Sequence, residues 1–322
     1  VGRYTKGYNL SRSQLLESYV NYSPTWGVHK LDVMAGYSWQ NNYWANRDIR
    51  YFNITHDMDL NPGETAETRY LWYRNENYLV SFYGRINYSL DSRYVFTFTA
   101  RGDGSSKFAR DHRWGFFPSV SAAYNISEED FFKENVSWVN QLKVRGSYGN
   151  LGNQAGAGLY AYLETMKIVV PNLGAGGTYY FGDERESYIE SPGAFNPFIT
   201  WEKVQSMNIA TDFSLWSNRL NGSVEWYQRN TRDMLGPSRD VADMFGAKPP
   251  QTNNADLQTR GWEVSLKWND KINDDWGYNL GFMLTDFRSV VTKYQNPTNF
   301  NPAGAWYEGK EVGEIWGYTS TS

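Results

Sequence analysis

Histidine is the residue in this chain best suited to metal binding or general-base catalysis. His29, His56 and His112 are the three histidines of the sequence. They are too widely scattered to indicate a metal site or a nucleophile paired with a base. The chain has no cysteine, so neither disulfides nor thiolate metal sites can form. The sequence therefore predicts no metal centre.

Three further motifs match known functional patterns only in part. Residues 101–103 read Arg-Gly-Asp, a match short enough to arise by chance, and we expect the glycine to bend the end of a strand into a turn. The acidic cluster 128–130 could support acid–base chemistry, but it is typical of a helix start, which Ser127 would cap. The glycine-rich runs 149–158 and 174–177 lack the spacing of a phosphate-binding loop. We expect no enzymatic activity and no cofactor.

The composition narrows the classes of protein to which the chain could belong. Hydrophobic residues make up 40% of the 322 residues and aromatic residues 17%, and the mean hydropathy is −0.66. The 31 basic and 35 acidic residues give a net charge of −4, which does not favour nucleic acid as a partner. No apolar stretch approaches the ~18 residues of a transmembrane helix. A membrane-spanning β-barrel needs no such stretch, because every second residue faces its lumen.

The elements that would position any functional residue are strands, because side chains alternate with a period of two. The segment 91–153 shows the pattern in three runs. In the first run, Tyr94, Phe96, Phe98 and Ala100 alternate with Val95, Thr97, Thr99 and Arg101. Along the whole chain we expect ten such strands, within residues 14–22, 30–39, 78–88, 93–101, 119–126, 142–148, 204–215, 220–229, 261–268 and 277–287.

The connections between these strands favour a membrane barrel over a soluble β-protein. Most odd-numbered connections are short, and the even-numbered ones are longer, with long irregular segments expected at 41–76, 151–198 and 235–254. The fifth connection, 127–140, is an exception that we expect to contain a small helix. Short turns at one end and long loops at the other are typical of an antiparallel outer-membrane barrel.

This interpretation divides the alternating side chains between lipid and lumen. Charged side chains suit a hydrated lumen better than a protein core, where unpaired charge is costly. The residues expected to face lipid are Phe96, Phe98, Tyr124, Val144, Trp226, Trp262 and Val264. The residues expected to face the lumen are Thr97, Arg101, Lys143, Arg145, Glu225 and Glu263.

Five ordered stretches resemble one known family. Residues 93–132, 136–154, 195–235, 253–268 and 308–318 closely resemble the SusC/RagA family of TonB-dependent outer-membrane transporters. Together they span most of 90–320, and the chain before them fits the preceding hairpins of that family less distinctively.

The resemblance implies a transport function in the bacterial outer membrane. It implies a 22-stranded barrel surrounded by outer-membrane lipids, with an N-terminal plug, energy from the TonB complex and a SusD-like lipoprotein as a lid. It also implies import of oligosaccharides or peptides too large for porins. The chain starts at Val1 and ends in a loop-like Gly317–Ser322, and it shows no plug, no TonB-contacting segment and no closing C-terminal strands. We therefore expect residues 1–322 to form about ten strands of a larger barrel.

Aromatic residues in the expected long loops are the candidates for binding the transported molecule. Trp72 and Tyr73 lie in the segment 41–76, and Tyr179 and Tyr180 lie among glycines in 151–198, which leaves them little local packing. Two alternatives remain open from the sequence. One is a self-contained ten-stranded pore, since barrels with an even strand number occur. The other is a soluble glycan-binding β-protein whose loop aromatics stack on sugars.

Overall fold

A single long-stranded antiparallel sheet forms most of the chain. The computed structural model describes residues 2–54, 67–166, 168–169, 180–181, 184–185, 188–189, 192–236, 250–294 and 306–317. The sheet order is β1-β3-β4-β5-β6-β7-β12-β13-β14-β15, and the short β2 (Thr25–Trp26) pairs with β3. The ten long strands are β1 (Gly2–Tyr22), β3 (His29–Ile54), β4 (Glu67–Leu90), β5 (Tyr94–Ser105), β6 (Trp114–Asn125), β7 (Val139–Asn153), β12 (Glu202–Leu215), β13 (Leu220–Leu235), β14 (Asn253–Lys271) and β15 (Gly277–Tyr294).

All ten strands expected from the alternation are present, each overlapping one of these long strands, and only the expected ends at Arg93 and Ile126 fall one residue outside β5 and β6. They are consecutive neighbours in the sheet, so the chain runs up and down without a crossover. Two pairs of two-residue strands lie apart from the sheet: β8 (Ile168–Val169) with β11 (Tyr188–Ile189), and β9 (Tyr180–Phe181) with β10 (Glu184–Arg185). The prediction of an all-β, antiparallel fold is therefore confirmed.

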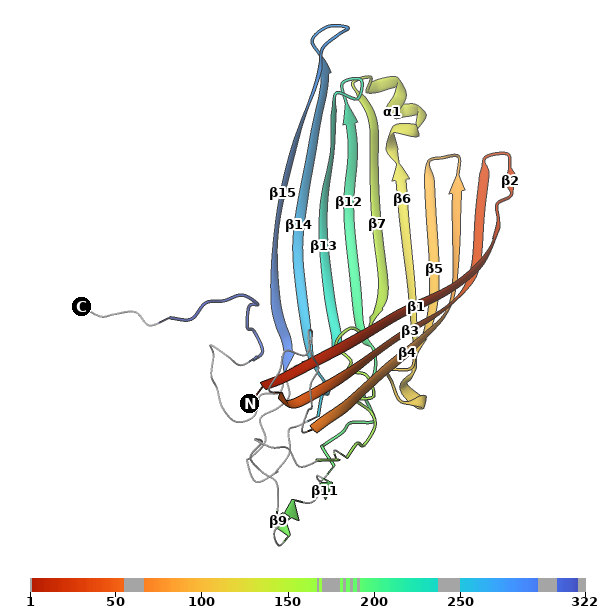
Figure 1. Ribbon diagram of the computed structural model, residues 1–322. Helices are drawn as coiled ribbons and strands as arrows, with labels where there is room; N and C mark the ends of the chain where they lie inside the picture. Colours follow the sequence, from red (N-terminus) through yellow and green to blue (C-terminus); the bar gives the residue numbers. More distant parts are fainter. Residues whose placement is uncertain are drawn as a thin grey trace, which may run out of the picture.

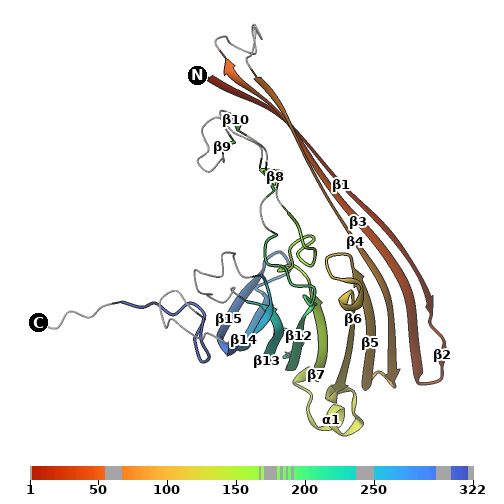
Figure 2. The same ribbon diagram turned by 90° about the horizontal axis from the view of Figure 1, so that it is seen from below.

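The sheet is curved into a trough and is not closed. Figure 2 shows the ten strands following an arc, with β8, β9 and β10 on its concave side. In the described part of the chain, β1 pairs only with β3, and β15 pairs with β14 as its one strand neighbour and forms a single isolated bridge from Val290 to Glu311. A self-contained ten-stranded barrel requires β1 to pair with β15, and that pairing is not present.

The segment 41–76 is not the irregular loop that we expected. β3 continues through Ile54 and β4 begins at Glu67, and the two strands pair along their full length from Phe52 and Glu67 to His29 and Leu90. β1 pairs with β3 over the same stretch, from Gly2 onward. The physical reason is that ladder hydrogen bonds join backbone groups, which any side chain supplies, so a strand persists where its side chains stop alternating in polarity.

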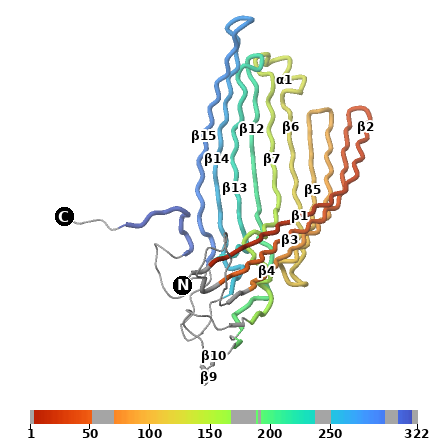
Figure 3. Tube along the Cα trace, in the orientation of Figure 1, coloured from red at the N-terminus to blue at the C-terminus, as the bar shows by residue number. Residues whose placement is uncertain are grey.

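These three strands extend well beyond their neighbours. β5 pairs with β4 only from Leu79 to Leu90, so the part of β4 before Leu79 has β3 as its strand neighbour. Figures 1 and 3 show β1, β3 and β4 running diagonally past the lower ends of β5 and β6. Just before Leu79, loop residues supply the hydrogen bonds that β5 does not make to the backbone of β4. The backbone of Tyr78 exchanges hydrogen bonds with Ser106, and the Tyr160 hydroxyl bonds to the backbone of Glu76.

The short connections lie at one end of the sheet, as expected. The turn 216–219 holds Trp216, Ser217 and Asn218 at positive φ values of 54°, 56° and 65°. Between β6 and β7 the chain forms a 3₁₀ turn (Ile126–Glu128) and α1 (Asp130–Asn135). The predicted cap is wrong, because α1 begins after Glu129 without a side-chain cap bond and Ser127 is buried in the 3₁₀ turn. No helix within the described residues is long and apolar enough to span a membrane.

Candidate functional site

One face of the sheet carries all seven residues that the sequence predicts to face lipid. Directly paired residues of neighbouring antiparallel strands point to the same face. One paired row runs Phe96–Ala122–Gly146–Ile209–Trp226–Trp262. The next runs Tyr94–Tyr124–Val144–Thr211–Val224–Val264. Phe98, two residues from Phe96 along β5, shares their face.

The opposite face carries the six residues predicted to face a lumen. One row runs Thr97–Ser121–Ser147–Asn208, and another runs Ala123–Arg145–Ala210–Glu225–Glu263. Lys143 and Arg101 follow on the same side by the period of two. The register therefore separates the sheet into an apolar, aromatic face and a polar, charged face.

The polar face is the concave one. Phe117 of β6 pairs with Arg101 and so belongs to the polar face. Its ring packs in a buried cluster with loop residues Ala157 and Ile199 and with Trp201, just before β12. In Figure 2 the loop segments that connect β7 to β12 lie within the arc of the sheet.

A charged network crosses three strands on the concave face. The Arg145 guanidinium of β7 donates to Asp212 of β12 at 3.1 Å and to Glu225 of β13 at 2.8 Å. Asn208 also donates its amide to Glu225. Glu263 lies directly opposite Glu225 on β14. A surface of bonded charges with further carboxylates beside it is suited to contact with water and polar solutes.

The Arg-Gly-Asp tripeptide forms part of the same face rather than a turn. β5 continues through Ser105, so the predicted bend at the glycine is wrong. Arg101 and Asp103 instead point to the same side and form an ion pair of 2.8 Å. Arg101 also donates to the buried Ser81 hydroxyl at 3.0 Å and lies over the Tyr83 ring. The two ends of the tripeptide therefore fix each other within the sheet.

A compact core lies where the long loops meet the concave face. Trp201 is only 3% exposed, and its indole packs 5.1 Å from the Phe108 ring and 5.6 Å from the Phe117 ring, centroid to centroid. The indole N–H donates to the Arg113 carbonyl at 2.9 Å. Three sequence segments thus meet around one aromatic side chain, which orders this rim of the trough.

A cavity of about 620 Å³ opens on the concave face beside this core. Its lining combines rings, amides and charges: Phe117, Trp201, Asn153, Gln154, Arg101 and Lys107. The Lys107 ammonium donates to the carbonyls of Gln154 and Ala157, each at 3.1 Å. Partial burial lowers the pKa of Lys107. Aromatic surface together with donors and acceptors is the chemistry that binds sugars and peptides alike.

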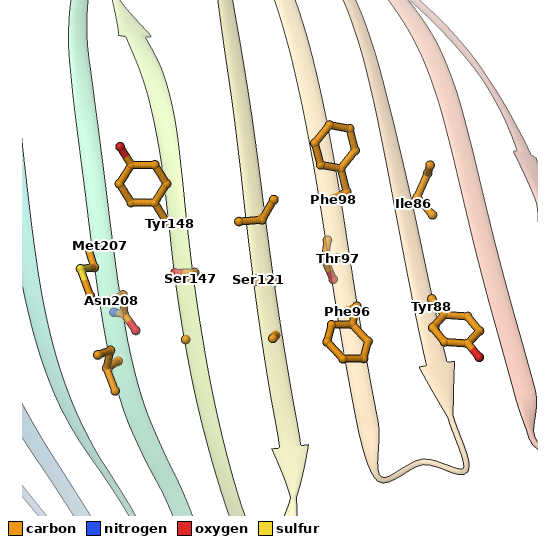
Figure 4. Close-up of a pocket in the computed structure, with 14 residues that line it drawn as sticks. Ile86, Tyr88, Phe96, Thr97, Phe98, Ser121, Ser147, Tyr148, Met207 and Asn208 are labelled. Carbon is orange, nitrogen blue, oxygen red and sulfur yellow. The ribbon is translucent and has the colours of Figure 1, made fainter.

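A second hollow, of about 720 Å³, lies on the apolar face. Figure 4 shows its aromatic and aliphatic walls on neighbouring strands, including Phe96, Phe98, Tyr148, Met207 and Ile86. The small residues Ala122 and Gly146 leave the space between those walls. This groove has few polar groups with which to orient a sugar or a peptide.

The predicted aromatic residues 72 and 73 lie on opposite faces of the sheet. Both residues lie on strand β4, and successive strand residues point to opposite faces. Trp72 pairs with Arg47 on the convex side, and Tyr73 points to the concave side. Tyr179 lies outside the described residues. Tyr180 belongs to β9, and its side chain lies outside the described part.

The histidines have structural partners where the structure describes them. His29 and Tyr88 share a hydrogen bond of 2.7 Å, and His112 packs edge-on against Phe198. His56 lies outside the described residues. Within the described part of the chain, no three His, Cys, Asp or Glu side chains form a group that could hold a metal ion.

Sequence reasoning missed the residues that build the rim. Lys107, Phe108 and Trp201 lie in or beside connections without periodicity, and they meet only because the loops return to the sheet. The one sequence signal for this loop core is the clustering of aromatic residues in 151–198, and it does not indicate which residues they contact. The charges of the concave face were predicted individually, but their pairing depends on the register.

The chain is similar to known outer-membrane receptors. A family model described as TonB dependent receptor-like, beta-barrel, matches residues 2–318. The chain is 34% identical over 301 residues to TonB-dependent receptor SusC of Bacteroides thetaiotaomicron, covering 90% of this chain and 27% of that protein. It is 29% identical over 332 residues to TonB-dependent receptor P3 of Formosa agariphila, covering 98% of this chain and 32% of that protein.

Solved structures agree on the architecture. The structure of the RagAB peptide transporter matches with a TM-score of 0.78 at 22% identity, covering 95% of this chain and 33% of that chain. The outer membrane transporter YddB from Escherichia coli matches with a TM-score of 0.59 at 10% identity, covering 88% of this chain and 34% of that chain. This chain thus spans about a third of the length of the proteins that it matches.

Proposed function

The chain belongs to the TonB-dependent receptor-like β-barrel family of the bacterial outer membrane, and from this premise we propose that it is one part of the barrel wall of an importer. The importer takes up bulky nutrients, oligosaccharides or peptides, with energy from the TonB complex. Its plug, its TonB-contacting segment and its remaining strands belong to the longer parent protein. The observation that carries the proposal is the separation of the sheet into an apolar convex face and a charged concave face.

The two faces receive different environments in this proposal. The convex face contacts lipid through Phe96, Phe98, Tyr124, Val144, Trp226, Trp262 and Val264. The concave face lines the hydrated lumen with Thr97, Arg101, Lys143, Arg145, Glu225 and Glu263. Large exposed apolar side chains support this assignment, since Phe96 is 49% and Phe98 is 45% exposed on a face with no protein layer over it among the described residues. A soluble glycan-binding protein would bury such a face.

The long loops face the cell exterior, as they do in barrels of this type. The loop core around Trp201 and the cavity beside it then lie at the mouth, beneath a SusD-like lipoprotein that acts as a lid. The cavity joins rings to hydrogen-bonding groups, and Tyr73 adds an aromatic surface on the same concave side. Tyr179 and Tyr180 stay our candidates for stacking on the transported molecule.

Removing the two tyrosines tests the import proposal directly. In cells that produce the full-length parent and its lid, Tyr179→Ala combined with Tyr180→Ala should reduce uptake roughly thirtyfold, because each stacked ring contributes ~1 kcal/mol. Uptake of labelled oligosaccharide and peptide pools is the measurement. Phe131→Ala with Phe132→Ala is the matched control, since these adjacent rings lie in α1 at the other end of the sheet.

Two outcomes would count against the proposal in different ways. Unchanged uptake by the tyrosine variant at normal surface abundance assigns Tyr179 and Tyr180 a structural role. If cells with the unaltered parent take up no more of either pool than cells without it, the import function itself is wrong.

A further inference from the structure

The convex side of β1, β3 and β4 changes from apolar to charged toward the long-loop ends of these strands. Nearer the short turns the paired rows are apolar, such as Leu16–Trp39–Val80. The row Gln14–Asn41–Tyr78 marks the transition. Beyond it, toward the long-loop end, the rows are Arg12–Tyr43–Glu76, Leu10–Ala45–Arg74 and Tyr8–Arg47–Trp72. Arginine and aromatic side chains thus follow directly on a surface that the proposed function places in lipid.

These side chains are arranged around one another. Arg12 and Arg74 lie over the Tyr43 ring, at 5.3 Å and 5.5 Å from its centroid. Arg47 lies over the Trp72 ring at 4.6 Å. We call Arg12, Tyr43, Arg47, Trp72 and Arg74 the arginine–aromatic patch. Stacking on rings holds guanidinium groups in place while leaving their N–H groups free to donate.

The patch has more positive charge than the structure neutralises. Arg74 is paired with Glu76 at 3.0 Å. Neither Arg12 nor Arg47 has a carboxylate partner within the described residues. The whole chain is acidic, with a net charge of −4, so a local excess of cations on an outward surface calls for an anionic partner.

The distance of the arginines from the apolar rows, measured along the strands, indicates the kind of partner. Arg12, Arg74 and Arg47 lie two, four and six residues beyond the row Gln14–Asn41–Tyr78, which is roughly 7–20 Å along the strands. The polar region of a bilayer begins at the edge of its ~30 Å hydrocarbon core. Phosphate and sugar groups of outer-leaflet lipids occupy this region.

We propose that the arginine–aromatic patch binds the phosphate groups of an anionic glycolipid in the outer leaflet. The guanidinium forks of Arg12 and Arg47 match phosphate geometry, and the exposed edge of Trp72, a side chain that is 67% exposed, packs against the sugar. A lid protein is a poorer fit, because it covers the concave mouth whereas this patch continues the convex, lipid-facing surface. The inference rests on the orientation given under the proposed function.

Charge removal on one face, with a matched removal on the other, tests the proposal. The full-length parent is purified, delipidated and titrated with diphosphoryl lipid A, and bound lipid is counted by native mass spectrometry. The test variant combines Arg12→Gln, Arg47→Gln and Arg74→Gln. The control combines Lys143→Gln, Arg229→Gln and Lys267→Gln, which removes the same charge from the concave face. Heat-modifiable gel mobility verifies folding of both.

We expect the test variant to bind lipid A at least about tenfold more weakly and the control within about twofold of the unaltered protein. Zwitterionic phosphatidylethanolamine should bind both proteins alike. If the triple variant does not fold, Arg47→Gln alone should weaken binding about threefold. Unchanged binding, or equal weakening in the control, overturns the proposal.

Two further arms separate the alternatives. Inorganic phosphate that competes as well as lipid A assigns the patch to free phosphate and overturns the glycolipid assignment. Loss of the lid lipoprotein from the test variant with lipid A binding unchanged assigns the patch to that protein and overturns it too. Nutrient uptake is measured in parallel, so that a lipid-binding result does not depend on whether the import function holds.

Discussion

Phe98→Arg should destabilise the barrel in lipid by about 2–4 kcal/mol, because it places a charge near the middle of the bilayer. Phe98 pairs with Ile86 and Val120 on the convex face. It lies four residues from Tyr94, roughly 13 Å along a strand, which at a tilt of ~40° is about 10 Å of depth. The free energy of unfolding of the full-length parent, measured by denaturant titration in lipid vesicles, gives the comparison.

Thr97→Arg is the control, since it adds the same charge one residue away on the concave face. Its neighbours there are Ser121 and Asn87, both polar, and water reaches that side in the proposed barrel. We expect a change below ~0.5 kcal/mol. Equal loss of stability in the two variants would mean that the two faces do not meet different media.

Trp201→Ala should cost about 3–5 kcal/mol of local stability, because it empties the centre of the loop core. The indole fills the space between Phe108 and Phe117, and the variant removes one of the two donors to the Arg113 carbonyl, the other being the Ser105 backbone N–H. The loops around the mouth should open while the strands persist. Hydrogen exchange should therefore speed up in residues 106–113 and 154–161 but not in the centres of β5 and β6.

Trp201→Phe separates the loss of packing from the loss of the N–H donor, and Trp216→Ala is the control. Trp201→Phe keeps an aromatic filling and removes the indole N–H, so it should cost about 1–2 kcal/mol. Trp216→Ala alters an exposed side chain in a short turn and should leave exchange in both loops unchanged. Unaltered loop exchange in Trp201→Ala would show that this core does not order the mouth.

The strands from β5 onward could be predicted because their two faces carry side chains of different polarity. Phe96 and Thr97 show this difference, and the alternation repeats on the long strands β6, β7, β12, β13, β14 and β15. Strand number, antiparallel order and the short turn at 216–219 followed from this pattern and from turn-forming residues. Both faces of the sheet could be assigned residue by residue.

The extension of β3 and β4 could not be predicted by the same argument. In 41–54 and 70–78, aromatic and charged residues occur on both faces, as Trp44 and Arg47 do. Because both faces carry polar and aromatic side chains here, polarity does not alternate along the strand, and the sequence predicts a loop. The bend predicted at Gly102 is wrong for a related reason, since a glycine within a paired strand and a glycine at a bend look alike in sequence.

The contacts of the site depend on register and on loop return, neither of which is local. Arg145 reaches Asp212 and Glu225, which lie 67 and 80 residues further along the chain. Trp201 bonds to a carbonyl that lies 88 residues before it. Residue types along the chain indicate which face a charge occupies, but they do not determine its partner.

If alternate residues of one strand meet lipid and water, site-directed spin labelling of β5 will distinguish the two media. Residues 1–322 contain no cysteine, so single cysteines at positions 94 to 101 can carry the label in lipid vesicles once any cysteine elsewhere in the full-length parent is replaced by serine. We predict high collision with oxygen at 94, 96, 98 and 100, and high collision with a water-soluble nickel complex at 95, 97, 99 and 101. Oxygen and nickel profiles that do not alternate, or that alternate in the opposite phase, would show that the convex face of β5 does not contact lipid.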